Sequence, residues 1–137
     1  MNNSRLVDII YSLSDKCFQH RKSHLKQLGL SRAEFKGLVC VDKDNIITCK
    51  EFSMRMGLSV SRGSRVIDKL HQKNHILRTS SPSDRRCKMI QLTKKGQKTR
   101  ARIDKEKDKC EQKLTSEMSG LQINQLKKDL LSLIDKL

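Results

Sequence analysis

The chain contains no tryptophan, a single proline and only 3% aromatic residues. Proteins that recognise single-stranded RNA or DNA stack bases on aromatic side chains, so this scarcity disfavours such recognition. No apolar run approaches the roughly 18–20 residues that a membrane-spanning helix requires. Residues 1–5 also lack the apolar core of a signal peptide. We therefore expect a cytoplasmic protein that does not act at a membrane.

Cysteine pairs and catalytic motifs are missing as well. The five cysteines are scattered and odd in number, with no C-x-x-C pair. This pattern argues against a disulfide scaffold and a zinc finger, and it suits a reducing compartment. The sequence contains no phosphate-binding glycine loop, no nucleophile elbow and no paired carboxylates in an apolar setting. We expect neither an enzyme nor a bound metal or cofactor.

Positive charge is the dominant feature of the composition. The formal net charge is +15 and the isoelectric point is near 9.9, so the chain repels itself and is attracted to phosphate backbones. Between residues 50 and 88 only three acids, Glu51, Asp68 and Asp84, oppose ten basic residues. These are Lys50, Arg55, Arg62, Arg65, Lys69, Lys73, Arg78, Arg85, Arg86 and Lys88. So concentrated a basic segment indicates a polyanionic partner.

Helical periodicity begins near the N-terminus. Apolar residues at helical spacing predict a first helix over about residues 4–28, which Gly29 ends. Ser31 and Glu34 have the spacing of a capping box, in which each side chain satisfies a backbone N–H at a helix start. A second helix should follow and break at residues 42–45.

The next segment predicts a helix-turn-helix. Residues 48–56 form its first helix, opened by a second capping box, Thr48 with Glu51. Gly57 supplies a left-handed turn and Ser59 caps a helix from Val60 to about residue 73. Its inward positions are Val60, Gly63, Val66, Ile67 and Leu70. Gly63 would allow close approach of the two helices, and Asn74 should stop the second.

A hairpin and two further helices complete the pattern. Period-two alternation predicts strands over residues 76–80 and 87–92 around a tip containing Pro82. Thr93 should cap a long charged helix with sparse apolar positions at Ile103, Cys110 and Leu114. The last helix carries a leucine-rich face (Leu126, Leu130, Leu133, Ile134 and Leu137). We expect a twin chain to cover this face; the alternative is that it folds back on the first helix.

Together these elements predict a mainly α protein with a small β wing. It is a winged helix-turn-helix flanked by N- and C-terminal dimerisation helices. We assign residues 1–30 to the N-terminal dimerisation helix and residues 31–93 to the DNA-binding lobe. Residues 94–137 hold the long helix and the C-terminal dimerisation helix.

The predicted DNA-binding side chains gather on the second helix and the wing. Residues in the first turns of a recognition helix reach base edges in the major groove, where one arginine can donate two hydrogen bonds to a guanine. An arginine at the wing tip can enter a minor groove. Asp84 would repel phosphate, so we expect it to brace a neighbouring arginine through an ion pair. The predicted set is Thr48, Lys50, Ser59, Ser61, Arg62, Ser64, Arg65, Lys69, Asp84, Arg85 and Arg86.

Four blocks of this sequence resemble the MarR/SlyA family of transcription regulators. They are residues 58–62 (LSVSR), 66–70 (VIDKL), 84–86 (DRR) and 92–96 (LTKKG), and the last two in that order are the most specific. The resemblance is strong over residues 30–96. It implies a two-fold symmetric homodimer on a pseudo-palindromic operator in double-stranded DNA. We expect this regulator to be a repressor associated with the nucleoid. It also implies a response to a small anion, a phenolic ligand, a metal or an oxidant.

The sensing residues are less well defined. Cys17, His20 and His24 share one face of the first helix, and Cys40 on the second helix and Cys110 on the long helix could converge on it. Thiolate and imidazole suit Zn²⁺ or a similar ion, and a thiol beside cations can be oxidised. A buried cysteine usually behaves as a small apolar residue, so pocket lining without special chemistry is the alternative.

Two other functions fit the same fold. A winged helix can serve as a protein–protein adaptor, its basic face docking an acidic partner. It can also act as a sequence-independent architectural DNA-binding protein. If charge reversal at Arg62 and Arg65 leaves DNA affinity unchanged, the adaptor is favoured over a regulator. Equal binding to scrambled duplexes favours the architectural protein.

Overall fold

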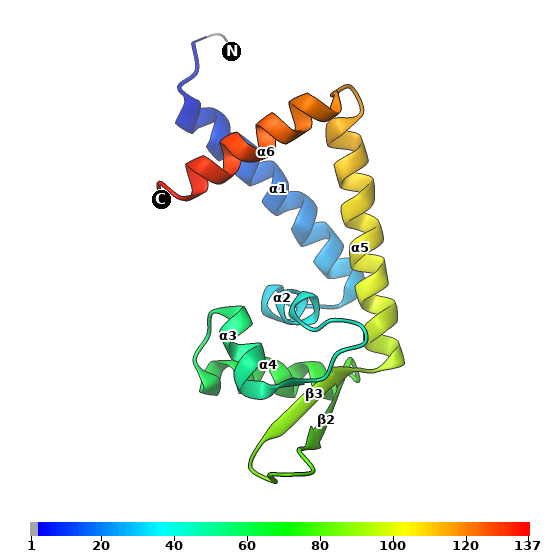
Figure 1. Cartoon of the computed structure of the whole chain (residues 1–137). Helices are drawn as coiled ribbons and strands as arrows, with labels where there is room; N and C mark the ends of the chain where they lie inside the picture. The colour runs from blue at the N-terminus through cyan, green and yellow to red at the C-terminus, as the bar shows by residue number, and fades with distance from the viewer. Residues whose placement is uncertain (1–2) are drawn as a thin grey trace. The chain divides into compact units, whose positions relative to one another are not determined.

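The structure is a computed structural model that describes residues 3–137 (Figure 1). Met1 and Asn2 lie outside the described residues, so the expectation for the extreme N-terminus stays a prediction. The chain divides into two compact units, residues 1–100 and residues 101–137. Among the described residues, no helix is both long enough and apolar enough to cross a membrane.

The first two helices begin and end close to the predicted positions. α1 (Leu6–Leu28) ends at Gly29, whose φ of 66° is the left-handed conformation that glycine adopts without strain. α2 (Arg32–Cys40) opens with the predicted capping box. The Glu34 N–H donates to Ser31 Oγ at 3.1 Å, and the Ser31 N–H donates to Glu34 Oε2 at 2.7 Å. Two backbone donors are thereby satisfied at the helix start.

The helix-turn-helix consists of α3 (Cys49–Met56) and α4 (Val60–Gln72). Gly57 has a φ of 68° and turns the chain between them. A Cβ added at Gly63 would lie 1.9 Å from Ser53 Oγ, so α3 and α4 approach as closely as predicted. The second capping box is only half formed. Thr48 Oγ1 accepts from the Glu51 N–H at 3.0 Å, but the Glu51 carboxylate pairs with Arg55 instead of reaching back.

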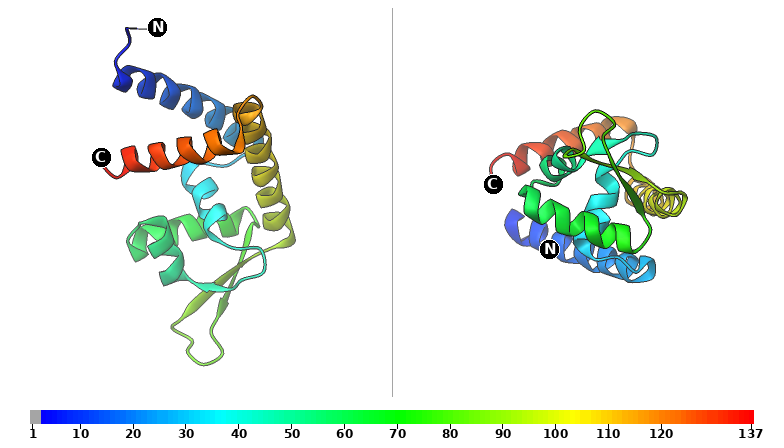
Figure 2. Two further views of the ribbon diagram at one scale, coloured as in Figure 1. Left: turned by 45° about the horizontal axis from the view of Figure 1, so that its top comes forward. Right: turned by 90° about the horizontal axis from the view of Figure 1, so that it is seen from below.

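A three-stranded antiparallel sheet forms the wing. β1 (Ile47–Thr48), β2 (Ile76–Ser80) and β3 (Lys88–Leu92) lie in the order β1-β3-β2. Ile76 pairs with Leu92 and Ser80 with Lys88, so the hairpin register is regular. β1 was not predicted; it pairs Ile47 with Ile90. Figure 2 shows the β2–β3 hairpin extending away from the neighbouring helices.

A small apolar core joins these elements, which we call the winged lobe (α2–α4 with β1–β3, residues 32–92). Asn74, at a φ of 62°, turns the chain from α4 into β2, as predicted for a helix stop.

The side chains of the apolar core are fully buried and come from the helices and strands of the lobe: Leu38, Phe52, Ile67, Leu70, Ile76 and Ile90. Burial of apolar area in this core is what fixes α4 against the sheet.

The C-terminal unit holds most of α5 (Lys94–Thr115) and all of α6 (Gly120–Ile134). Thr93 Oγ1 accepts from the Gly96 N–H at 3.0 Å, which confirms it as the cap of α5. Ser119 and Gln122 form a further capping box at the start of α6. Ile103 is buried, whereas Leu114 is exposed. Within the described chain, the apolar face of α6 also stays exposed at Leu126, Leu130 and Ile134, and Leu137, beyond the end of α6, is exposed as well.

Candidate nucleic-acid interface

The two faces of α4 differ sharply. Gly63, Val66, Ile67 and Leu70 are buried against the lobe. Five predicted DNA-binding side chains are exposed on the remainder of the helix: Ser61, Arg62, Ser64, Arg65 and Lys69. Since apolar residues recur every three to four positions, the polar ones are directed outward by the same periodicity. α4 therefore presents a continuous cationic and hydroxyl-bearing surface.

Val60 differs from the sequence prediction. It was expected to point inward, but its side chain is 55% exposed. It is the first residue of α4, where the helix has barely begun to pack on the lobe, so periodicity does not govern its burial. That prediction was wrong.

Two of the predicted DNA-binding hydroxyls cap helices. Ser59 Oγ accepts from the Arg62 N–H at 3.2 Å, which fixes the start of α4. Thr48 Oγ1 does the same for α3. Each hydroxyl retains its own O–H as a donor. Lys50, beside Thr48, is exposed. The N-terminal ends of both helices therefore expose donors on the lobe.

An ion pair that the sequence analysis missed joins α4 to the wing. Arg78 on β2 donates to the Asp68 carboxylate on α4, and both side chains are about half exposed. Asp68 is the only acidic residue on α4, so Arg78 offsets the one negative charge on this helix. The ten-residue separation between them crosses a turn, and helical spacing alone could not reveal the contact.

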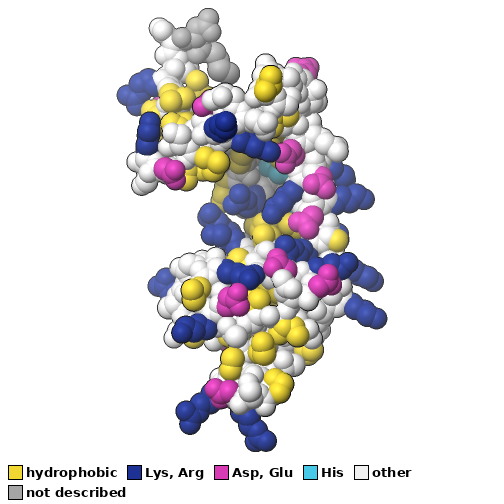
Figure 3. All heavy atoms as spheres, in the orientation of Figure 1, with side chains coloured by type: hydrophobic (Ala, Val, Ile, Leu, Met, Phe, Trp, Pro, Cys, Tyr) yellow, Lys and Arg dark blue, Asp and Glu magenta, His cyan; other side chains and the backbone are white. Residues whose placement is uncertain are grey.

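The wing tip also differs in detail from the prediction. Asp84 Oδ1 accepts from the backbone N–H of Arg86 at 2.9 Å, and the Cys87 N–H donates to Asp84 O at 3.1 Å. Within residues 3–137 no ion pair joins Asp84 to an arginine side chain. Asp84 therefore shapes the turn through the backbone, and the predicted brace was wrong. Arg85 and Arg86 are exposed at the tip, where Figure 3 shows Lys and Arg side chains projecting.

An open groove of about 670 Å³ lies within the winged lobe. α3, α4 and the wing all contribute to its lining. Its lining mixes apolar side chains with cationic and hydroxyl-bearing ones, which include Lys50, Ser64, Arg78, Ser80, Arg86 and Lys88. Lys88 Nζ donates to Ser80 Oγ at 3.1 Å across the hairpin. The four cationic side chains in this lining suit a phosphate-bearing strand.

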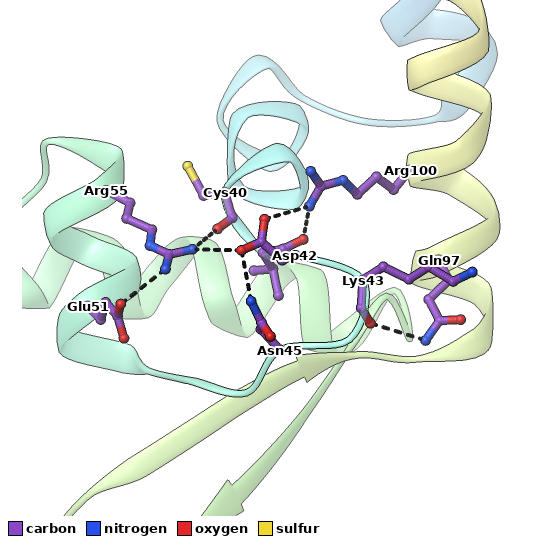
Figure 4. Close-up of polar contacts among 9 residues, drawn as sticks. Cys40, Asp42, Lys43, Asn45, Glu51, Arg55, Gln97 and Arg100 are labelled. Atoms are coloured by element: carbon purple, nitrogen blue, oxygen red, sulfur yellow. Dashed lines mark hydrogen bonds and ion pairs between the residues drawn. The ribbon is translucent and has the colours of Figure 1, made fainter.

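The C-terminal end of α2 is held by two arginines (Figure 4). Arg55 from α3 donates to Cys40 O at 2.9 Å and lies 3.7 Å from Asp42 Oδ2. Arg100 from α5 donates to Val41 O and lies 3.9 Å from Asp42 Oδ1. Guanidinium groups at a helix C-terminus satisfy its orphan carbonyls and its partial negative charge. This cluster was not predicted, and it ties α3 and the first turns of α5 to α2.

The predicted sensing residues differ in their surroundings. Cys17 and His20 are exposed, and His24 packs edge-on against Phe35 with ring centroids 6.4 Å apart. Cys40 is half-buried, and burial raises the pKa of its thiol against the opposing effect of Arg55. Cys110 is half-buried in the second unit. Within residues 3–137, no three His, Cys, Asp or Glu side chains are grouped to hold a metal ion.

A helix-turn-helix whose second helix exposes arginine and serine, followed by a basic hairpin, defines a winged helix-turn-helix protein. The sequence model of the MarR family matches residues 30–88, which covers most of the winged lobe. The transcriptional repressor MprA of Escherichia coli K12 is 28% identical over 137 residues, covering 96% of this chain and 78% of MprA. The regulator MhqR of Bacillus subtilis 168 is 31% identical over 77 residues, 56% of this chain and 53% of MhqR.

Solved structures share the fold over nearly the whole chain. The S. aureus MepR–DNA complex matches with a TM-score of 0.77 and 22% identity, covering 98% of this chain and 100% of MepR. The transcriptional regulator SlyA matches with a TM-score of 0.76 and 21% identity, covering 97% and 94%. The family match, the similarity to MprA and the shared fold support a MarR-family winged-helix regulator. MarR-family transcriptional regulators are not enzymes.

Proposed function

We propose that this chain binds double-stranded DNA sequence-specifically, as a homodimer on a pseudo-palindromic operator. The observation that carries the proposal is the polarity of α4. Its exposed arginines and serines lie opposite a fully apolar buried face, on the same lobe as two exposed wing-tip arginines. MepR, a structural neighbour, has been crystallised with DNA. The family relationship and the charge distribution support the same partner.

Each predicted residue receives a role in this proposal. Ser61, Arg62, Ser64 and Arg65 lie in the major groove, and Arg85 or Arg86 enters the adjacent minor groove. Lys50 and Lys69 neutralise phosphates, and the hydroxyls of Thr48 and Ser59 donate to phosphate while capping their helices. Asp84 contributes through the wing turn. Arg78 contributes by neutralising Asp68.

The exposed apolar side chains support the homodimer. On α6 they include Leu126, Leu130 and Ile134, and on α1 they include Leu6 and Leu13. Leaving apolar surfaces of this kind in water is unfavourable, and exposed apolar patches mark sites of protein–protein interaction. A twin chain buries them and presents two copies of α4, which is the requirement for reading two half-sites about one helical turn apart.

We further propose repression in the nucleoid of the cytoplasm, relieved by a small effector. MprA, similar over most of its length, is named a transcriptional repressor. A hollow of about 300 Å³ is lined by Phe18 and Leu25 together with three cations, Arg21, Lys22 and Arg32. The apolar parts of these side chains form the lining, which suits a small aromatic ligand better than a metal or an oxidant. Benzoate should raise the unfolding temperature of the native protein, and Arg21→Gln with Arg32→Gln should abolish that shift.

The proposed function is tested by selection from random duplexes followed by gel shifts at several salt concentrations. We expect one inverted repeat to be enriched. Charge reversal at Arg62 and Arg65 (R62E/R65E) should weaken binding about 100-fold, since each base or phosphate contact contributes about 1–3 kcal/mol. The matched control reverses the exposed Lys105 and Lys109 of α5 and should bind normally. Unchanged DNA affinity in R62E/R65E would favour the adaptor, and equal binding to scrambled duplexes would favour the architectural protein.

A further inference from the structure

Val60 is an aliphatic side chain within a polar surface. It is the first residue of α4, directly after the N-cap Ser59, and it is 55% exposed. It lines the groove of the winged lobe together with Ser64, one helical turn further along. Lys50 lines the same groove from α3. The exposed methyl groups of Val60 thus stand among hydroxyl and ammonium groups that suit DNA.

Burial does not explain this side chain. The apolar face of α4 that packs on the lobe consists of Val66, Ile67 and Leu70, each no more than 8% exposed. Val60 has no comparable packing, and a valine in the first turn of a helix is a poorer helix former than alanine. Its methyl groups would gain free energy only if the bound partner offered them an apolar surface.

The major groove of DNA offers one such group on a base edge. Thymine carries a C5-methyl, whereas the other three bases present only hydrogen-bond donors, acceptors and ring C–H groups there. The first residues of a recognition helix are the ones that reach base edges. Val60 occupies that position, and its polar neighbour Ser61 is suited to the hydrogen-bonding part of the same edge.

We propose that Val60 is a specificity-determining residue that packs on the C5-methyl of a thymine in each operator half-site. The proposal rests on the function proposed above and adds the identity of one base to it. Arginines in the same helix select guanine through hydrogen bonds, whereas Val60 selects thymine through apolar contact. The operator therefore contains a thymine whose methyl group, rather than its hydrogen-bonding atoms, is read.

The experiment removes the methyl group from either side of the contact. Deoxyuridine replaces each thymine of the selected operator in turn, which deletes the methyl and keeps the base pair. Wild-type dimer, Val60→Ala and Val60→Thr are compared by titration against each duplex. The control is Met54→Ala, because Met54 is an aliphatic residue of α3, 71% exposed, that does not line the groove. Thermal unfolding verifies that each variant is folded.

At one thymine per half-site, replacement by deoxyuridine should weaken wild-type binding about fourfold, because burial of one methyl-sized group contributes a change in affinity of that size. The same replacement should change the affinity of Val60→Ala less than about 1.5-fold, with Val60→Thr intermediate and Met54→Ala like the wild type. Equal sensitivity of wild type and Val60→Ala at every thymine overturns the inference while leaving sequence-specific binding intact. Failure to select any operator overturns the proposed function itself, and this inference falls with it.

Discussion

Lys73 and Glu34 form an ion pair across 39 residues of sequence. Lys73 Nζ, just past the end of α4, lies 2.9 Å from Glu34 Oε2 on α2. The same ammonium donates to Gly29 O at 2.8 Å. Burial alone would raise the pKa of Glu34, but the Ser31 N–H and the Lys73 ammonium together hold that pKa below its usual value. One lysine therefore fastens α4 to the end of α1 and the start of α2.

Replacing this lysine should destabilise the fold. In Lys73→Met, the Glu34 carboxylate, only 4% exposed, loses its charged partner. Because the Lys73 side chain itself is 41% exposed, solvent screening reduces the loss to about 1–2 kcal/mol. Urea titration at neutral pH measures the difference. Lys69→Met, a fully solvated change on the same helix, is the control and should cost less than about 0.5 kcal/mol. Equal effects of the two substitutions would contradict the assigned contact.

His75 should make stability depend on pH in mildly acidic solution. It is 4% exposed, and its Nδ1 has no hydrogen-bond partner within the described residues. Burial lowers the pKa of His75 below 6.5, and the nearby Lys95 and Lys73 lower it further against the opposing effect of Glu34. The unfolded chain therefore binds a proton at a pH where the folded chain does not. Stability should be constant above about pH 6.5 and fall below it, until the folded pKa is reached.

Urea midpoints at half-unit intervals between pH 7.5 and 5 measure this slope. Glu34, with its lowered pKa, stays ionised over that window, so its contribution is lost only below about pH 4.5. His75→Leu, which fills the site with a neutral side chain, should flatten the curve. A slope that persists unchanged in His75→Leu would show that other groups produce it.

The Arg78–Asp68 pair should tune DNA affinity rather than stability. Both side chains are about half exposed, so breaking the pair should cost less than about 1 kcal/mol of folding free energy. Asp68→Asn removes the one negative charge of α4 and leaves Arg78 free to neutralise a phosphate. Its affinity should rise, and the dependence of log K on log salt should steepen by about one ion per protomer.

The reverse substitution gives the matching test. Arg78→Gln leaves the Asp68 carboxylate unopposed on the face turned to DNA, so its affinity should fall and its salt dependence should become shallower. Gel shifts between 50 and 200 mM salt distinguish the two variants. Salt dependences that move in the same direction would show that this pair lies away from bound DNA.

Local signals in the sequence predicted the helices and their ends well. Ser31, Ser59 and Thr93 cap helices, and Gly29 and Gly57 adopt the left-handed conformation, because each depends on only three or four neighbouring residues. β1 was missed, because a two-residue strand has no alternating pattern and exists only through pairing with β3.

The functional residues were predicted less evenly, for the same reason. Outward arginines on α4 follow from the burial of its opposite face, which helical periodicity reveals. Val60 does not follow the periodicity, because the first turn of a helix packs against few other residues. The partners of Asp68 and Asp84 depend on how β2 approaches α4 and how the wing turns, and neither follows from residue spacing. Which side chains pair across a turn can be identified only from the folded structure.

The contact of Gly63 with Ser53 should tolerate no side chain. In Gly63→Ala the new Cβ would meet Ser53 Oγ at 1.9 Å and Ser53 Cβ at 2.7 Å, so α3 and α4 must separate. Overpacking of this kind should cost about 1–3 kcal/mol and lower DNA affinity, since the angle between the two helices changes. Adding Ser53→Gly removes both atoms and should restore part of the stability. Gly120→Ala, where the added Cβ meets nothing within 4 Å, is the control and should leave stability within about 0.5 kcal/mol. If Gly63→Ala is as stable as this control, close packing of α3 on α4 does not determine the geometry of the helix-turn-helix.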